Sequence, residues 1–247
     1  MRINQYIAAC GAASRRKAEA LVLEGRISIN GVVVRELAQQ VGETDIVLLD
    51  GQKITPALQH TTIAFHKPPG VICTTADPQG RKTIYDCLPS GFANLKYAGR
   101  LDLQSRGLVL LSDDGELVYR LMHPKYQIER SYLVWTSKNL SRRAIESLLQ
   151  GIDIGDGEIG QAKDVFLDNG FFELVLTEGK NREIRRMLHA LHYHIEDLKR
   201  ISFANIELGD LAVGDYREIK GEELSELKKF VYSQACEKCE KATLKQS

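Results

Sequence analysis

From Thr62 onward, segments with the pattern of strands and segments with the pattern of helices follow one another in an irregular order. Apolar runs of strand length lie at 63–66, 71–75, 108–111, 131–135 and 171–176, and helical patterns lie at 117–122, 142–150 and 181–191. A doubly wound sheet needs strands and helices to alternate regularly. The order seen here therefore predicts an α+β fold rather than a doubly wound one.

A smaller unit precedes this region. Apolar side chains at helical spacing predict a first helix over 3–10, and Ser14 is placed to cap a second helix. The dipeptides Asn30-Gly31 and Asp50-Gly51 follow β-branched or aliphatic runs and predict two tight hairpins. Residues 1–54 are therefore predicted to be a separate domain of two helices on a small hairpin sheet.

This N-terminal domain is basic, although the whole chain is neutral. The first 35 residues hold six basic and two acidic side chains, a net charge of +4, whereas the chain holds 33 of each sign. Arg15, Arg16 and Lys17 occupy the first turn of the second predicted helix, where cations oppose the helix dipole. Because cations at this end of a helix lower its stability, their presence is better explained by binding of an anion than by folding. A solvated charged face is the alternative.

The composition restricts the class of protein. With 247 residues, 43% of them hydrophobic and 27% charged, the chain is typical of a globular protein rather than a disordered or membrane one. No apolar run approaches the ~18 residues of a membrane helix, and no signal-peptide core is evident. Five cysteines favour a reducing cytoplasm over a disulfide framework. We expect a linker at 55–61, a larger domain at 62–232 and a polar tail at 233–247.

Two metal-site candidates are weak. His189, His192 and His194 lie close together, but no further ligand is evident. Cys236 and Cys239 form a lone CxxC in the charged tail, without the second pair that a structural zinc site needs. No Gly-rich nucleotide-binding loop is present, so we expect neither a metal nor a cofactor.

One acidic residue stands out as a candidate for chemistry. Asp102 follows Gly99 and Arg100 in a loop ahead of the buried strand 108–111. Loops on a rigid scaffold are common places for catalytic groups. Taken alone, however, an Asp in a loop is more often a turn former.

The segment 14–34 resembles the S4-like alpha-L RNA-binding module found in ribosomal and RNA-modifying proteins. The match includes the Ser-Arg-Arg helix start, the Glu-Gly-Arg step and the Asn-Gly hairpin. The resemblance implies that the RNA-facing surface includes Arg15, Arg16, Lys17 and Arg26. It does not imply catalysis.

The larger domain resembles the rRNA pseudouridine synthases of the small-subunit and large-subunit type. The match lies, in chain order, in the segments 67–75, 99–117, 123–134, 178–188 and 198–219. The resemblance implies a catalytic domain built on a mixed or antiparallel sheet. It also implies an isomerisation in which the glycosidic N–C bond of a uridine is broken and the base is rejoined through carbon.

The resemblance also implies roles for individual residues. Asp102 corresponds to the essential carboxylate, and Arg185 is expected to pair with it. Tyr132 would place its ring against the uracil, and Arg130 is the basic residue two positions earlier. Ile201 is expected to flank the base.

The expected site also includes two arginines, and two of its positions differ from the resembled family. Arg100 and Arg106 could hold the phosphates that flank a flipped uridine. The family often has Gln at the position of Glu183 and Thr at the position of Ser105. Glu183 adds a negative charge beside an RNA site, whereas Ser105 keeps the hydroxyl.

The expected function is therefore pseudouridine formation in ribosomal RNA by a monomeric enzyme, with the large subunit slightly favoured. Small-subunit rRNA is the first alternative, and transfer RNA is another. A non-catalytic RNA-binding ribosome-assembly factor would have the same RNA-binding module. A hydrolase that uses Asp102 on nucleoside bonds would instead release free uracil.

Overall fold

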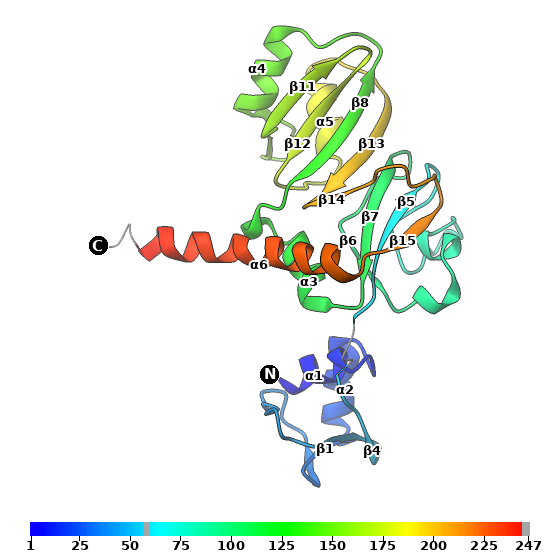
Figure 1. Cartoon of the computed structure of the whole chain (residues 1–247), viewed down its shortest axis with the longest axis vertical. Coiled ribbons are helices and arrows are strands. Elements are labelled where there is room, and N and C mark those ends of the chain that lie inside the picture. Colours follow the sequence, from blue (N-terminus) through cyan, green and yellow to red (C-terminus); the bar gives the residue numbers. More distant parts are fainter. Residues whose placement is uncertain (57–59, 244–247) are drawn as a thin grey trace. The chain divides into compact units, whose positions relative to one another are not determined.

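The computed structural model describes residues 1–56 and 60–243, and for 235–243 it describes the backbone alone. The chain forms two compact units, Met1–His60 with Asp113–Gly115, and Thr61–Ser112 with Glu116–Ser247. Each unit is described here by itself (Figure 1). Residues 57–59 of the expected linker and 244–247 of the expected tail lie outside the described residues.

The first unit packs two helices on a small antiparallel sheet. Its elements are α1 (Ile3–Ala9), α2 (Arg15–Leu23), β1 (Ile27–Ile29), β2 (Val32–Val34), β3 (Val47–Leu49) and β4 (Gln52–Lys53), with strand order β2-β1-β3-β4. Ser14 caps α2 by accepting a hydrogen bond from the Lys17 amide. Asn30-Gly31 and Asp50-Gly51 both have positive φ at both positions, as the predicted two-residue hairpin turns require.

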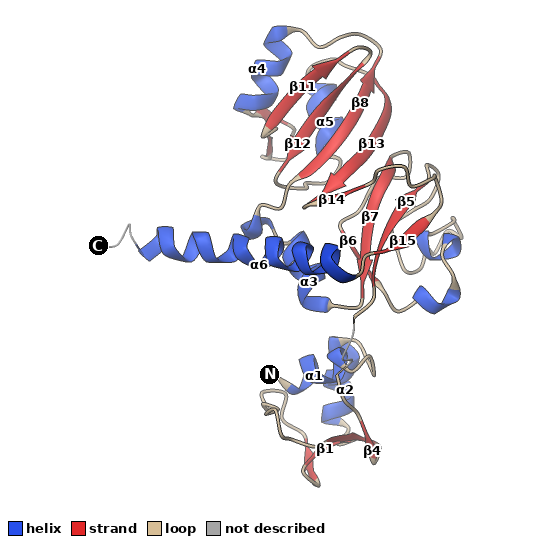
Figure 2. Cartoon of the chain, in the orientation of Figure 1, coloured by secondary structure: helices blue, strands red, loops and turns tan. Residues whose placement is uncertain are grey.

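The second unit is built on one large mixed sheet (Figure 2). Its main path runs β11-β12-β8-β13-β7-β5-β15, while β6 pairs with β7 and β14 pairs with β13. The strands are β5 (Thr62–Lys67), β6 (Lys96–Ala98), β7 (Arg106–Ser112), β8 (Arg130–Thr136), β11 (Asp164–Asp168), β12 (Phe171–Leu176), β13 (Ile195–Phe203), β14 (Ile206–Glu207) and β15 (Tyr216–Glu218). The expected α+β class is confirmed.

The helices of this unit contribute to two hydrophobic clusters. Side chains of α4 (Arg142–Gln150) and α5 (Glu183–Ala190) belong to one cluster, together with a short hairpin of β9 (Ile152–Asp153) and β10 (Ile159–Gly160). Side chains of α3 (Gly115–Met122) and α6 (Gly221–Thr243) belong to the other. Strand residues alternate between the two, since Phe65 and Val109 join the first and Ala64 and Leu108 join the second.

The pairing of β7 with β13 joins the two halves of the sheet. It is parallel, with Arg106 opposite Lys199 and Gly107 opposite Arg200, whereas the neighbouring strand pairs are antiparallel. A Cβ on Gly107 would lie 2.3 Å from the carbonyl oxygen of Arg200. Glycine is therefore needed where the two strands approach each other.

Two expectations differ from the structure. The run 71–75 is not a strand and makes one isolated bridge, from Ile72 to Thr83. Its apolar side chains, including Val71 and Cys73, are buried without a strand, which an apolar run alone cannot reveal. The segment 233–243, expected as a polar tail, continues α6. Within the described residues, no helix has the length and apolar character needed to cross a membrane.

Candidate active site

Asp102 lies in the loop between β6 and β7. The loop begins at Gly99, whose φ is +73°, and Ser105 closes a turn by donating its amide to the Asp102 carbonyl oxygen at 3.1 Å. The Gly70 amide donates to the Leu103 carbonyl oxygen at 2.8 Å. These backbone contacts fix the loop at Asp102 and at the residue after it, while the carboxylate remains partly exposed.

A buried lysine donates hydrogen bonds to the backbone of the same loop. Lys67 ends β5 with no solvent exposure. Its ammonium donates to the carbonyl oxygens of Pro68, Leu103 and Ser105 at 2.9, 3.4 and 2.7 Å. Burial lowers the pKa of Lys67 to about 8. Lys67 therefore joins the strand end to the loop residues that directly follow Asp102.

Two arginines approach the carboxylate from the start of α5. Arg185 donates through Nε to Oδ2 of Asp102 at 3.1 Å and through Nη2 to the Ser105 hydroxyl at 3.0 Å. Arg182, whose φ of +49° places it in the left-handed region, has Nη1 3.6 Å from the same oxygen. Arg185 is thus held by both a carboxylate and a hydroxyl, which fixes its orientation.

These groups line a cavity of about 420 Å³. The lining side chains that carry charge or could pack against a base include Arg100, Asp102, Arg130, Tyr132, Arg182, Arg185, Leu198 and Arg200. The full lining holds six cationic side chains against three carboxylates, because Lys180, Glu178 and Glu183 also contribute to it. The cavity therefore suits an anionic ligand that presents its reacting part to Asp102.

The wall of the cavity is formed by neighbouring strands. Tyr132 of β8 is 7% exposed and Arg200 of β13 is 1% exposed. Arg200 donates to the Leu108 carbonyl oxygen at 2.6 Å and to the Tyr132 hydroxyl at 3.4 Å. Arg130 donates to the carbonyl oxygens of Leu121 and Ile128, and burial lowers its pKa. The Tyr132 ring therefore lies beside a fixed cation, Arg200.

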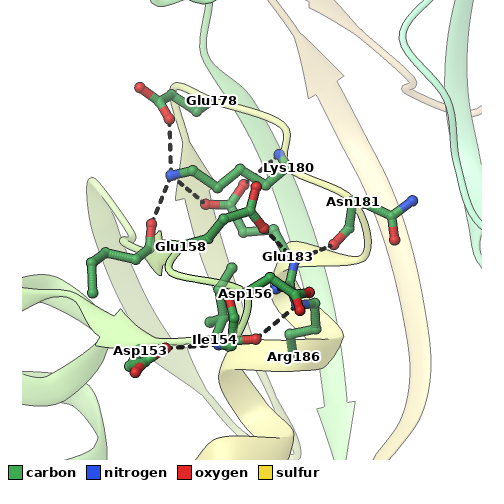
Figure 3. Close-up of polar contacts among 11 residues, drawn as sticks. Asp153, Ile154, Asp156, Glu158, Glu178, Lys180, Asn181, Glu183 and Arg186 are labelled. Carbon is green, nitrogen blue, oxygen red and sulfur yellow. Dashed lines mark hydrogen bonds and ion pairs between the residues drawn. The ribbon is translucent and has the colours of Figure 1, made fainter.

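Helix α5 is braced by the β9–β10 hairpin (Figure 3). Arg186 donates to the carbonyl oxygens of Ile154 and Gly155 at 2.8 and 2.9 Å, and it pairs with Glu158 and Asp156 at 2.5 and 3.2 Å. Arg186 directly follows Arg185. The hairpin therefore helps to fix the helix turn that carries the arginine bound to Asp102.

Lys180 and Glu183 tie the preceding loop to the same hairpin (Figure 3). The Lys180 ammonium donates to the Ile159 carbonyl oxygen at 2.7 Å and lies 3.0 Å from the Glu178 carboxylate. Glu183 accepts from the Lys180 amide at 2.9 Å, and burial raises its pKa. The acid at position 183, a departure from the resembled family, thus accepts a backbone hydrogen bond within the loop.

Several predicted site residues lie elsewhere. Arg106 pairs with Asp197 at 2.7 Å, stacks over Trp135 and does not line the cavity. Ile201 also lies outside the lining, because successive β13 side chains alternate and Leu198 and Arg200 face the cavity instead. Neither residue therefore lines this cavity, and their expected contacts with the RNA remain predictions.

The predicted RNA-facing residues of the first unit differ in their partners. Arg15, Arg16 and Lys17 are exposed along the first turn of α2. Arg26 pairs with Asp50 at 2.5 Å and with Glu24 at 3.6 Å, so carboxylates already bind its guanidinium. The helix start is the stronger candidate for contact with an anion.

Sequence reasoning missed Lys67, Arg182 and Arg200. Lys67 ends a strand that is largely apolar, and this was the available signal, whereas β13 holds several charged residues and gave no signal for Arg200. The contacts of Lys67 with Leu103 and Ser105, and of Arg200 with Leu108, join segments that are distant in the sequence. Among the described residues, no group of three or more His, Cys, Asp or Glu could hold a metal ion. The Cys236 and Cys239 side chains lie outside the described residues.

Comparison with known proteins assigns a class to this fold and cavity. Residues 61–190 match the family model described as RNA pseudouridylate synthase, so the chain belongs to this family of RNA-modifying isomerases. Residues 1–47 match the S4 domain model, which identifies the first unit as an S4 domain.

The chain is also similar along most of its length to individual proteins of this kind. The chain is 35% identical over 238 residues to an uncharacterized RNA pseudouridine synthase of Aquifex aeolicus, covering 94% of this chain and 95% of that protein. It is 35% identical over 233 residues to ribosomal large subunit pseudouridine synthase B of Bacillus subtilis, covering 92% and 95%. A crystal structure of a pseudouridylate synthase is similar with a TM-score of 0.66 and 27% identity, covering 93% of this chain and 99% of that one.

Proposed function

We propose that this protein converts one uridine of large-subunit ribosomal RNA to pseudouridine, with Asp102 as its catalytic carboxylate. The observation that carries the proposal is the position of Asp102 in a cationic cavity, bound by Arg185 at 3.1 Å. The relative from Bacillus subtilis, named for the large ribosomal subunit, supports this choice of RNA.

The reaction needs a carboxylate and no oxidant. The glycosidic bond between N1 and C1′ breaks, the uracil turns, and C5 bonds to C1′ while the C5 proton is lost and N1 gains one. Asp102 acts on the ribose, either by bonding to C1′ or by removing a sugar proton, and both roles require its ionised form. Arg185 and Arg182 pair with the carboxylate and hold it in place.

The substrate must be brought out of its helix or loop. A uridine stacked in folded RNA cannot reach Asp102, so the enzyme flips it at a cost of a few kcal/mol. The Tyr132 ring packs against the flipped uracil, and Arg100 and Arg130 contribute positive charge beside it. The enzyme acts as a monomer in the cytoplasm, and its S4 domain adds phosphate contacts through Arg15, Arg16 and Lys17.

A map of pseudouridines in ribosomal RNA tests the proposal. Cells that lack the gene should lose one large-subunit site, wild type should restore it, and Asp102→Asn should not. The Asp102→Asn protein should still bind the RNA, because the substitution keeps the size of the side chain. Restoration of the site by Asp102→Asn would overturn the catalytic assignment.

The same map separates the alternative functions. Loss of a small-subunit site would identify the other ribosomal substrate. An unchanged map would favour a non-catalytic assembly factor. Free uracil released from RNA by the purified protein would indicate a hydrolase, because an isomerase keeps the base attached.

A further inference from the structure

A cluster of aromatic rings lies where α3 ends and the 3₁₀ turn η3 (Pro124–Tyr126) begins. The ring centroids of Tyr119 and His123 are 5.2 Å apart, and each lies 6.1 Å from that of Tyr126. The rings meet edge to face, at 61° to 85°. Such packing holds each ring in a fixed orientation.

The three rings differ in burial. Tyr126 is 6% exposed and belongs to the hydrophobic core, whereas Tyr119 is 41% exposed and His123 is partly exposed. The His123 ring accepts a hydrogen bond through Nδ1 from the Lys125 amide at 3.2 Å, which fixes its orientation. Tyr126 therefore supports the cluster, and Tyr119 and His123 form its outer surface.

Positive charge accompanies the rings. The Lys125 ammonium lies 4.7 Å from the ring centroid of Tyr126 and 5.5 Å from that of Tyr119. A hydrogen bond with Tyr126 raises the pKa of Lys125, so the ammonium is charged at neutral pH. Arg120 lies on the Tyr126 ring and is paired with Glu116 at 2.8 Å, and Lys125 is the exposed residue of the two.

Two residues next to the cluster in the chain line the catalytic cavity. Met122 and Pro124 line the cavity that contains Asp102, and Met122 is 45% exposed. Tyr119 and His123 lie three positions before and one position after Met122. An RNA strand whose uridine is turned toward Asp102 would thus pass the rings as it leaves the cavity.

We propose that Tyr119 and His123 form a stacking platform for an unpaired base next to the target uridine, with Lys125 beside the connecting phosphate. The proposal rests on the proposed function, because it concerns the RNA that enters the same cavity. Aromatic rings interleaved with cations bind single-stranded RNA through base stacking and phosphate contacts. The RNA around the target must therefore be single-stranded on that side.

Kinetics with Tyr119→Ala test the platform, using unmodified large-subunit ribosomal RNA transcribed in vitro. We expect the substitution to raise KM about tenfold and to leave kcat unchanged, because stacking with one base is lost while Asp102 keeps its partners. Tyr119→Trp retains a ring and should keep the wild-type KM. The matched control is Phe166→Ala, which removes an exposed aromatic ring on the edge strand β11.

Fluorescence gives a second measurement that a purely structural role of Tyr119 would not change. The chain has one tryptophan, Trp135, which both Tyr119→Trp and Phe166→Trp retain. A stacked base should quench the emission of the new tryptophan in Tyr119→Trp when the transcript is added, and leave that of Phe166→Trp unchanged.

The outcomes separate this proposal from the proposed function. If Tyr119→Ala has a KM within about twofold of that of Phe166→Ala and the emission is not quenched, the platform is rejected although the enzyme is active. If wild type makes no pseudouridine in the transcript, the proposed function fails. The platform is then judged by the quenching and by the dissociation constants of the two alanine variants.

Discussion

Individual cations around Asp102 contribute in different ways because their burial differs. Arg182 is largely exposed and lies 3.6 Å from the carboxylate, so it can turn toward an RNA phosphate. Arg185 is bound at both ends of its guanidinium and keeps the carboxylate in place. Lys67 does not touch the carboxylate and binds the backbone of its loop.

Lys67→Met should change both activity and the pH dependence of stability. Burial lowers the pKa of Lys67 from 10.5 to about 8, so between these values the unfolded chain binds more protons than the folded chain. The free energy of unfolding of wild type should therefore gain up to a few kcal/mol from this group as pH rises from about 8 to 10.5. The gain should be absent in Lys67→Met.

Chemical denaturation at several pH values measures this difference. The variant should also have a lower kcat, because the loop loses the ammonium that binds the carbonyl oxygens of Leu103 and Ser105. Lys163→Met is the control, since its side chain is 46% exposed. A parallel pH dependence of wild type and Lys67→Met would contradict the prediction.

At the scale of elements, the hairpin β9–β10 and helix α5 act as one support. Arg186→Ala should lower the free energy of unfolding by about 2 kcal/mol, because charged hydrogen bonds to the hairpin are lost. It should lower kcat by about tenfold or more, since Arg185 on the same turn is displaced from Asp102. Denaturation and single-turnover kinetics measure the two effects.

An exposed arginine provides the comparison for this variant. The Arg142 side chain is 94% exposed and pairs with Glu146 within α4. Arg142→Ala should change stability by no more than about 0.5 kcal/mol and leave kcat unchanged. Equal kcat values for Arg186→Ala and Arg142→Ala would mean that the hairpin does not position Arg185.

Elements with local signals were predictable from the sequence, and those set by distant contacts were not. Ser14 caps α2 as predicted, and the Asn30-Gly31 turn has the predicted form. The run 71–75 has residues typical of a strand but does not form one, because tertiary contacts rather than local propensity decide its conformation. The orientation of Ile201 away from the cavity likewise depends on how β13 pairs with β7 and β8.

At the scale of the whole molecule, the S4 domain and the catalytic unit should make separable contributions. Replacing Arg15 and Arg16 with Gln should weaken RNA binding and reduce the slope of log affinity against log salt by about 1 to 2, because fewer phosphates are neutralised. The value of kcat should not change, since neither residue lines the cavity. Binding titrations over a range of salt concentrations measure the slope.

The chain contains a matched pair for this test. Arg142 and Arg143 follow the cap Ser141 and begin α4, as Arg15 and Arg16 follow Ser14 and begin α2. Replacing Arg142 and Arg143 with Gln should leave the salt slope unchanged. Equal slopes for the two double variants would indicate that the charge of the S4 domain does not bind the RNA.

The parallel junction of β7 and β13 affects the order in which a newly made chain becomes competent. The loop of Asp102 is synthesised long before β13. Strand β13 supplies Arg200 and packs against Gly107 of β7, the strand that follows the loop. Contacts between segments so distant in sequence form late in folding. We therefore expect an incomplete chain to fold its S4 domain, and to bind RNA with it, before it has the cavity that could modify that RNA.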